Sequence, residues 1–475
     1  MNNKIKNIIK NFTHVFSANA ISLLISLFSI VIIPKIIGVE EYGYWQLYMF
    51  YISYVGFFHL GHADGVYLKY GGRSYDQLNR RIFVSQFWIL VFFELFFSVC
   101  IFLTVYLNID NFTELFIITM VCINMVIILP RTLLILTLQA TNRMRDYARV
   151  LTTEKILYGI IMGAFIICGI RDYKILIYAD ILAKGVSFSL SIFYCKDIVI
   201  GNFSDLKTSI KEAIDNVRIG IKLMFANIAS LLIIGTIRFG IEKNWDIATF
   251  GKISLTLSIS NMLMIFVNAI GTILYPMLRN TPTTQLPKIY TKMRDMLMIF
   301  LIGLLTIYFP AKWALSLWLP QYNDSLHYMA LLFPICIYES KMSMLISTYY
   351  KALRKEKLMM VLNWITVGMS LIATYVCTYI VTNLTLSVIT ITILIAFRCI
   401  ISEVILAFNM NVRVWKDTIL ELLITIGFIL PAWFISDFKG MLIFISVYCI
   451  YLLIKRKELN DILTLALTMK SRLRS

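Results

Sequence analysis

The sequence carries little charge and has almost no long polar segment. Asp, Glu, Lys and Arg make up 15% of its 475 residues, whereas hydrophobic residues make up 59%. Soluble domains average roughly 25% and 45–50% for these two classes. Apolar stretches of about 18 residues or more recur along the chain, which is typical of transmembrane helices. The composition excludes a soluble globular protein and predicts an all-α polytopic membrane protein.

The sequence also lacks the cysteine spacings of a disulfide framework or a zinc site. Its eight cysteines include no Cys-x-x-Cys pair and fall within or beside apolar stretches, so we expect packed thiols and no metal or other cofactor. No small-residue cleavage site follows the basic segment 1–13, which predicts an uncleaved first helix. The net charge of +17 lies mostly in short loops, without basic runs interleaved with aromatics. Nucleic acid is therefore not an expected partner.

The apolar stretches predict about fourteen transmembrane helices. Lys and Arg number 32 in the alternate connections that include the N-terminus, and 4 in the remaining connections. Because positively charged loops stay cytoplasmic, both termini are predicted to be cytoplasmic. The amphipathic stretch 206–217 is predicted to lie along the membrane surface. The expected spans are 14–37, 43–67, 83–107, 114–138, 150–170, 174–194, 219–241, 247–278, 295–319, 326–350, 358–380, 384–409, 418–436 and 440–454.

An internal duplication divides these spans into repeats. Residues 18–25 match residues 226–233 at six of eight positions, and six predicted spans separate the two copies. An even number of spans keeps the copies in the same orientation, which predicts parallel repeats and a transporter layout. We expect a six-helix bundle at 1–210, a second at 211–417, and two additional helices with a basic cytoplasmic tail at 418–475.

The eight Lys and Arg residues not counted in connections are assigned to the membrane interior. A cation near the bilayer centre costs roughly 3 kcal/mol or more, so such residues usually face a hydrated interior. The sequence therefore predicts an anionic ligand for the deep or repeat-related cations, with structural ion pairs as the alternative. For Lys35 and Lys312, which are nearer the interface, we expect snorkelling. The candidate ligand-binding cations are Arg131, Lys184, Arg238, Lys252, Lys341 and Arg398.

Four polar residues are further candidates. Asn19 and Asn227 occupy matching repeat positions and are expected to bond ligand hydroxyls or to join helices. His62 and Asp64, near the inner end of the second span, are expected to carry a proton-coupling step or to satisfy local backbone groups. For Arg398, the candidate acidic partners are Asp180, Glu94 and Glu403.

Three segments resemble motifs of the Wzx-type polysaccharide repeat-unit (O-antigen) flippases. Residues 37–47 (IGVEEYGYWQL) resemble that family's pattern at the start of the second helix. Residues 60–71 resemble the end of that helix, and residues 139–147 resemble the loop after the fourth helix. The family belongs to the superfamily of multidrug exporters and the lipid II flippase. The likeness extends over the whole chain in length, span number and duplication.

The resemblance implies a function for the intramembrane cations. It implies a flippase of the bacterial inner (cytoplasmic) membrane that moves undecaprenyl-diphosphate-linked oligosaccharide from the cytoplasmic to the periplasmic leaflet by alternating access. A cationic central cavity would accommodate the diphosphate while the tail stays near membrane lipid. Coupling to protons or sodium, and partnership with a polysaccharide polymerase and chain-length machinery, are implied as well.

Two other functions compete with this one. A multidrug exporter of the same superfamily would favour cationic drugs and thus buried carboxylates, but the residues assigned to the membrane interior are eight cations and six acids. A membrane polysaccharide polymerase or ligase would need a large external loop with catalytic residues, and no predicted external loop exceeds about ten residues. A transporter that is not an enzyme is therefore expected.

Overall fold

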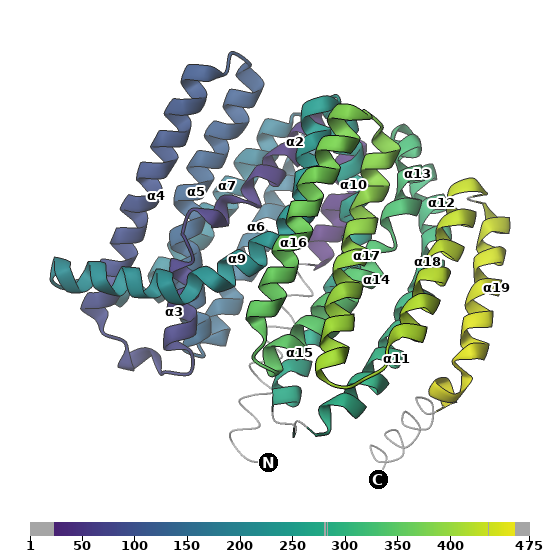
Figure 1. The fold of residues 1–475 in the computed structure, drawn as a ribbon. Helices are drawn as coiled ribbons and strands as arrows, with labels where there is room; N and C mark the ends of the chain where they lie inside the picture. Colours follow the sequence, from purple (N-terminus) through teal and green to yellow (C-terminus); the bar gives the residue numbers. More distant parts are fainter. Residues whose placement is uncertain (1–22, 280–281, 283, 436, 461–475) are drawn as a thin grey trace, which may run out of the picture. The chain divides into compact units, whose positions relative to one another are not determined.

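The computed structural model describes residues 23–279, 282, 284–435 and 437–460, and all regular elements in these ranges are helices. The all-α prediction is confirmed. The chain divides into two compact units, 1–228 and 229–475. α9 (Leu206–Asn244) begins in the first unit and ends in the second (Figure 1).

The first unit contains the helices before α9 and the start of α9 itself. Asn79, Asn111 and Asp172 accept backbone hydrogen bonds at the N-termini of three of its long helices, which satisfies amides that have no partner inside the helix. The elements are Leu23–Ile37, α2 (Val39–Ile52), η1 (Val55–Phe57), α3 (His62–Tyr70), η2 (Tyr75–Gln77), α4 (Arg80–Asn108), α5 (Phe112–Ala140), α6 (Met144–Ile167), α7 (Tyr173–Tyr194) and α8 (Lys196–Val199).

The second predicted span is broken into α2, η1 and α3. Gly61 has φ +79°, and a Cβ there would lie 2.6 Å from the backbone nitrogen of Ile221 on α9. A Cβ on Gly65 would lie 1.8 Å from the backbone oxygen of Asn216. Only glycine permits so close a crossing of α3 and α9. The structure thus gives a physical reason for the glycines of the 60–71 motif.

The stretch 206–217 is helical and forms the beginning of α9. That it lies along the membrane surface stays a prediction. α9 has 39 residues and is therefore about 58 Å long at 1.5 Å per residue, far longer than a bilayer core needs. The polar turns before residue 219 continue into the apolar part without a break.

The second unit contains the end of α9 and all later helices. Asn383 accepts the hydrogen bond of the Leu386 amide at the start of α17. Two π-helical turns, η5 and η6, interrupt the α-helical pattern. The elements are α10 (Ile247–Arg279), α11 (Leu286–Leu304), η3 (Leu305–Ile307), α12 (Tyr308–Trp318), η4 (Pro320–Tyr322), α13 (Asn323–Leu332), α14 (Ile335–Ser340), η5 (Lys341–Ile346), α15 (Ser347–Ala352), α16 (Glu356–Thr374), η6 (Tyr375–Ile380), α17 (Leu384–Asn409), α18 (Trp415–Phe434) and α19 (Phe438–Ile454).

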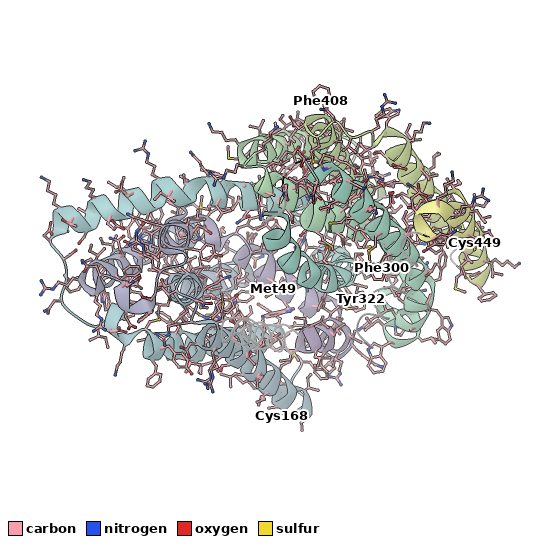
Figure 2. The ribbon with its side chains drawn as sticks, turned by 90° about the horizontal axis from the view of Figure 1, so that it is seen from below. Met49, Cys168, Phe300, Tyr322, Phe408 and Cys449 are labelled. Atoms are coloured by element: carbon pink, nitrogen blue, oxygen red, sulfur yellow. The ribbon has the colours of Figure 1, made fainter. Side chains whose placement is uncertain are left out.

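Many large apolar side chains face outward, as a membrane protein requires. In the described ranges, nine helices are long and apolar enough to cross a membrane, and the pair 320–332 and 335–352, bent by 46°, would make a tenth. The count of fourteen stays a prediction. In the second unit Phe408 is 82% exposed, whereas Tyr322 is fully buried among the helices (Figure 2).

Candidate functional site

In the first unit, Lys184 belongs to a hydrogen-bonded cluster around Asp180. The Lys184 ammonium lies 2.6 Å from Oδ2 of Asp180, one helical turn away on α7. The Tyr48 hydroxyl on α2 and the Asn124 amide on α5 donate to the same oxygen at 2.9 and 3.0 Å. All four side chains are buried. Three donors converge on the Asp180 side chain, which places a carboxylate directly beside the ammonium of Lys184.

Arg131, also in the first unit, is held by one carboxylate and one hydroxyl. On α5 its guanidinium pairs with Glu154 of α6, and its Nε donates to the Ser187 hydroxyl of α7 at 2.9 Å. Lys155 lies 3.5 Å from the other oxygen of Glu154. Arg131 and Glu154 are both buried. The pair therefore joins three helices through one guanidinium.

Arg398 has a similar environment in the second unit. From α17 it donates to Oε1 of Glu339 on α14 at 2.6 Å and to the Ser230 hydroxyl on α9 at 2.6 Å. Arg398 is 2% exposed, and its Nε has no hydrogen-bond partner in the described part of the chain. Asp180, Glu94 and Glu403, the candidate partners from the sequence, do not pair with it. Glu339 takes this role because α14 packs against α17.

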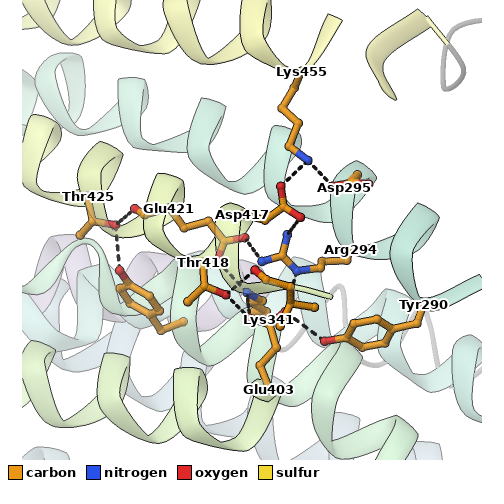
Figure 3. Close-up of polar contacts among 12 residues, drawn as sticks. Tyr290, Arg294, Asp295, Lys341, Glu403, Asp417, Thr418, Glu421, Thr425 and Lys455 are labelled. Carbon is orange, nitrogen blue, oxygen red and sulfur yellow. Dashed lines mark hydrogen bonds and ion pairs between the residues drawn. The ribbon is translucent and has the colours of Figure 1, made fainter. Parts of the chain in front are cut away.

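A larger buried ionic network lies in the second unit (Figure 3). Lys341, in η5, pairs with Glu403 of α17 and lies 2.6 Å from Oε2 of Glu421 on α18. Arg294 of α11 joins the same two carboxylates, at 2.6 Å from Glu403 and 2.7 Å from Glu421. The Tyr290 hydroxyl donates to Glu403 at 3.0 Å. The centre of the network contains two cations and two carboxylates.

A second layer of ion pairs connects the network to the end of α19. Lys455 lies 2.8 Å from Asp417 of α18 and 2.8 Å from Asp295 of α11. Asp417 is also 3.5 Å from Arg294. Charged contacts thus tie the last two helices, α18 and α19, to α11 and α17. Breaking one partner of such a buried set costs about 3–5 kcal/mol because it leaves a charge uncompensated.

The structure therefore pairs each of the four deepest candidate cations with carboxylates, the arrangement that the sequence left as the alternative. The two remaining candidates are Arg238 and Lys252. Arg238 donates to the Ser254 hydroxyl at 2.8 Å and lies over the Phe250 ring at 5.2 Å. Lys252 is half-buried and makes no ion pair with a described carboxylate.

The candidate polar residues do not form one group. The His62 ring contacts the Gln86 side chain at 2.8 Å, while the closest histidine to Asp64 is His59, at 3.9 Å. Asn227 is exposed on α9. Asn19 lies outside the described residues. Among the residues described, no three His, Cys, Asp or Glu side chains are grouped to hold a metal ion.

Sequence reasoning missed Arg294 and Glu154. We assigned Arg294 to a cytoplasmic connection at 279–294, but α11 begins at Leu286 and buries Arg294 to 2% exposure. Glu154 falls at the start of the predicted span 150–170, where an acid looks interfacial. The sequence does contain a signal for Arg294. Tyr290 and Arg294 are one helical turn apart just before the apolar run, which indicates that they share one face of a helix that begins earlier.

Comparison with known proteins identifies the fold. No protein-family model matches this sequence, and no curated protein matches it. The structure of the lipid II flippase MurJ in an inward closed conformation is similar, with a TM-score of 0.67 and 13% identity, covering 94% of this chain and 99% of that chain.

Two further solved structures are transporters of the MOP superfamily. An inward-facing multidrug resistance MATE family transporter has a TM-score of 0.59 and 13% identity, covering 83% of this chain and 98% of its own. A MOP superfamily transporter from Pyrococcus furiosus has a TM-score of 0.53 and 13% identity, covering 85% and 96%. The chain therefore shares the fold of the MOP superfamily transporters and of MurJ, and it is a multi-pass membrane protein.

Proposed function

We propose that this chain is a flippase that moves undecaprenyl-diphosphate-linked oligosaccharide repeat units from the cytoplasmic to the periplasmic leaflet of the bacterial inner membrane by alternating access. The likeness to a lipid II flippase carries this proposal. It covers 94% of the chain, whereas the likeness to the MATE multidrug transporter covers 83%. The lipid flippase therefore leaves less of this chain without a counterpart than the drug transporter does.

In this proposal, Arg131 and Arg398 bind the diphosphate by exchanging their counter-ions. Each guanidinium is buried and held by one glutamate and one serine. A guanidinium binds phosphate oxygens bidentately and remains charged throughout. In this proposal, an arriving diphosphate replaces the glutamate as the counter-ion, so that the arginine is never left unpaired in the membrane.

Exchange of counter-ions would also keep binding moderate, which transport requires. A buried cation without a partner would bind an anion tightly and release it slowly. In the first unit, Glu154 has Lys155 at 3.5 Å as a second cation when Arg131 turns to the ligand. Lys184, Arg238, Lys252 and Lys341 stay candidates for further positive charge toward a ligand, and Asn227 and Asn19 stay candidates for bonds to its sugars.

The coupling ion in this proposal is a proton or sodium, with His62 and Asp64 as the candidates. Because His59 is the histidine nearest Asp64, a proton step at Asp64 would involve His59 more directly than His62. The polymerase that consumes the exported units and its chain-length machinery are the proposed protein partners.

Loss of the chain tests this function. Cells without it should lose surface polysaccharide and accumulate lipid-linked repeat units that external glycosidases cannot reach, while export of ethidium stays unchanged. Re-expression of the intact chain should reverse both effects. Normal polysaccharide combined with raised ethidium retention would instead identify a multidrug exporter.

A further inference from the structure

Helices of the second unit line a cavity of about 1090 Å³ that is open to the surface and lies away from the ion pairs described above. It lies where α12 and α18 end and where α13, α17 and α19 begin. Trp313, Asn323, Thr385, Trp433 and Phe438 line it, one from each of these helices. The charge asymmetry of the connections predicts that this end faces away from the cytoplasm.

Aromatic side chains form a fixed wall of the cavity. The Trp433 ring lies 3.9 Å from the His327 ring, centroid to centroid, and 5.8 Å from the Tyr328 ring. The Tyr328 hydroxyl is 3.5 Å from that of Thr385, which holds Tyr328 in place. Trp313 also lines the cavity, yet it is 66% exposed. The indole of Trp433 is thus held in position before a ligand binds, and the indole of Trp313 is exposed enough for a ligand to contact it.

The polar side chains of the cavity are of mixed sign. Lys312 supplies one cation, and Asp324 and Asp437 supply two carboxylates. In the described ranges Lys312 makes no ion pair; its ammonium lies over the Tyr308 ring at 5.9 Å. Lys312 lines this cavity, and its snorkelling to the interface stays a prediction. Donors and acceptors are both available around the aromatic wall.

We infer that this cavity is a carbohydrate subsite that receives the sugar portion of the lipid-linked substrate on the outer side of the membrane. This inference rests on the proposed function. A sugar ring presents C–H faces that pack on indoles, and its hydroxyl groups each donate and accept hydrogen bonds. A cavity with Lys312 as a donor, two aspartates as acceptors and a fixed aromatic wall matches both properties.

Other ligand classes fit less well. Two carboxylates against one lysine disfavour a polyphosphate. The charged and polar side chains disfavour an acyl chain, since burying unpaired polar groups is costly. An organic cation would match the aspartates and the rings but would lie close to the ammonium of Lys312. A neutral polyhydroxyl ligand avoids all three conflicts.

The test measures protection of a cysteine in the cavity from a membrane-impermeant maleimide. Thr385→Cys places the thiol in the cavity, and Cys168, which is exposed at the end of α6 (Figure 2), serves as the control within the same molecule. Labelling of intact cells is compared by peptide mass spectrometry in two strains. One lacks the polymerase and accumulates exported lipid-linked units; the other lacks the first glycosyltransferase and makes none.

The inference predicts that labelling at position 385, relative to Cys168, is at least about threefold slower in the accumulating strain, as expected for a site that is mostly occupied. Equal rates in the two strains would overturn it. To test for a cationic ligand, tetraphenylphosphonium is added to the second strain and labelling at position 385 is measured again. Protection by this compound, without protection by the oligosaccharide, would also overturn the inference.

A second variant separates recognition from folding. Trp313→Ala should weaken binding by about fivefold if one aromatic contact of about 1 kcal/mol is lost, and so bring labelling at position 385 close to the unprotected rate. Trp415→Ala removes an indole of matched exposure, 65% against 66%, outside the cavity, and should leave protection unchanged. Equal protection in both variants would count against the subsite. If the chain is essential for surface polysaccharide but shows no protection, the subsite fails while the proposed function stands.

Discussion

The guanidinium of Arg398 donates to Glu339 at 2.6 Å across the contact between α17 and α14, with Ser230 as its second partner. In the other unit, Arg131 has the same combination of one glutamate and one serine. Two buried arginines with matching partners allow the structural and ligand-binding roles of an intramembrane cation to be separated by mutation.

The first prediction concerns the pair Arg398 and Glu339. Glu339→Gln should lower the free energy of unfolding by about 3 kcal/mol because it leaves a buried guanidinium without its counter-ion. The double variant Arg398→Gln/Glu339→Gln should recover most of this loss but should still export no surface polysaccharide. Thermal unfolding of the purified protein and polysaccharide staining are the measurements. Full export by the double variant would show that the pair is structural only.

The second prediction concerns the shape of the cation. Arg398→Lys should retain the protein in the membrane but reduce surface polysaccharide several-fold. Lysine carries the charge without the planar fork that reaches two partners at once. Immunoblotting controls for the amount of protein. Unimpaired complementation would mean that charge alone is sufficient at this position.

The third prediction concerns the buried network. Lys341→Met should destabilise the second unit by about 3–5 kcal/mol, since Glu403 and Glu421 would then share only Arg294 in the low-dielectric interior. Adding Glu421→Gln should restore a large part of the stability because one cation would face one carboxylate. The midpoint of thermal unfolding reports both effects. A double variant no more stable than Lys341→Met would refute this account of the network.

The fourth prediction concerns Cys195, between α7 and α8. Burial raises the pKa of this thiol to about 12, so the folded protein holds its proton more tightly than the unfolded chain does. Because maleimides react with the thiolate, Cys195 should remain unlabelled from pH 7 to pH 9 in detergent, whereas exposed Cys168 reacts. Unfolding in denaturant should make both reactive. Rapid labelling of Cys195 in the folded protein would contradict its burial.

The fifth prediction concerns topology. Reporter fusions at Ser209 and Asn323 should report a cytoplasmic and a periplasmic location, respectively, as the distribution of Lys and Arg predicts. Alkaline phosphatase and green fluorescent protein give opposite readings at each site, so each fusion controls the other. Reversed readings would place the second unit's cavity on the cytoplasmic side and would remove its proposed role.

Much of the fold was predictable because membrane helices are set by local composition. The limits of α5 and α17 lie close to the predicted spans 114–138 and 384–409, since a long apolar run has no other stable conformation in lipid. The break between α2 and α3 was not predictable in the same way. It depends on the close approach of α9 to Gly61 and Gly65, which are distant in sequence.

In the candidate site, too, local sequence predicts some features and tertiary packing decides the others. Composition alone shows that Arg131, Lys184, Lys341 and Arg398 lie deep within apolar spans, because hydropathy is a property of the local chain. Only the packing of helices decides that Glu339, two residues before Lys341, bonds to Arg398 while Lys341 turns to Glu403 and Glu421. Residues two apart on a helix face different neighbours, and ion pairs act over a few ångströms, so the choice of partner belongs to the tertiary structure.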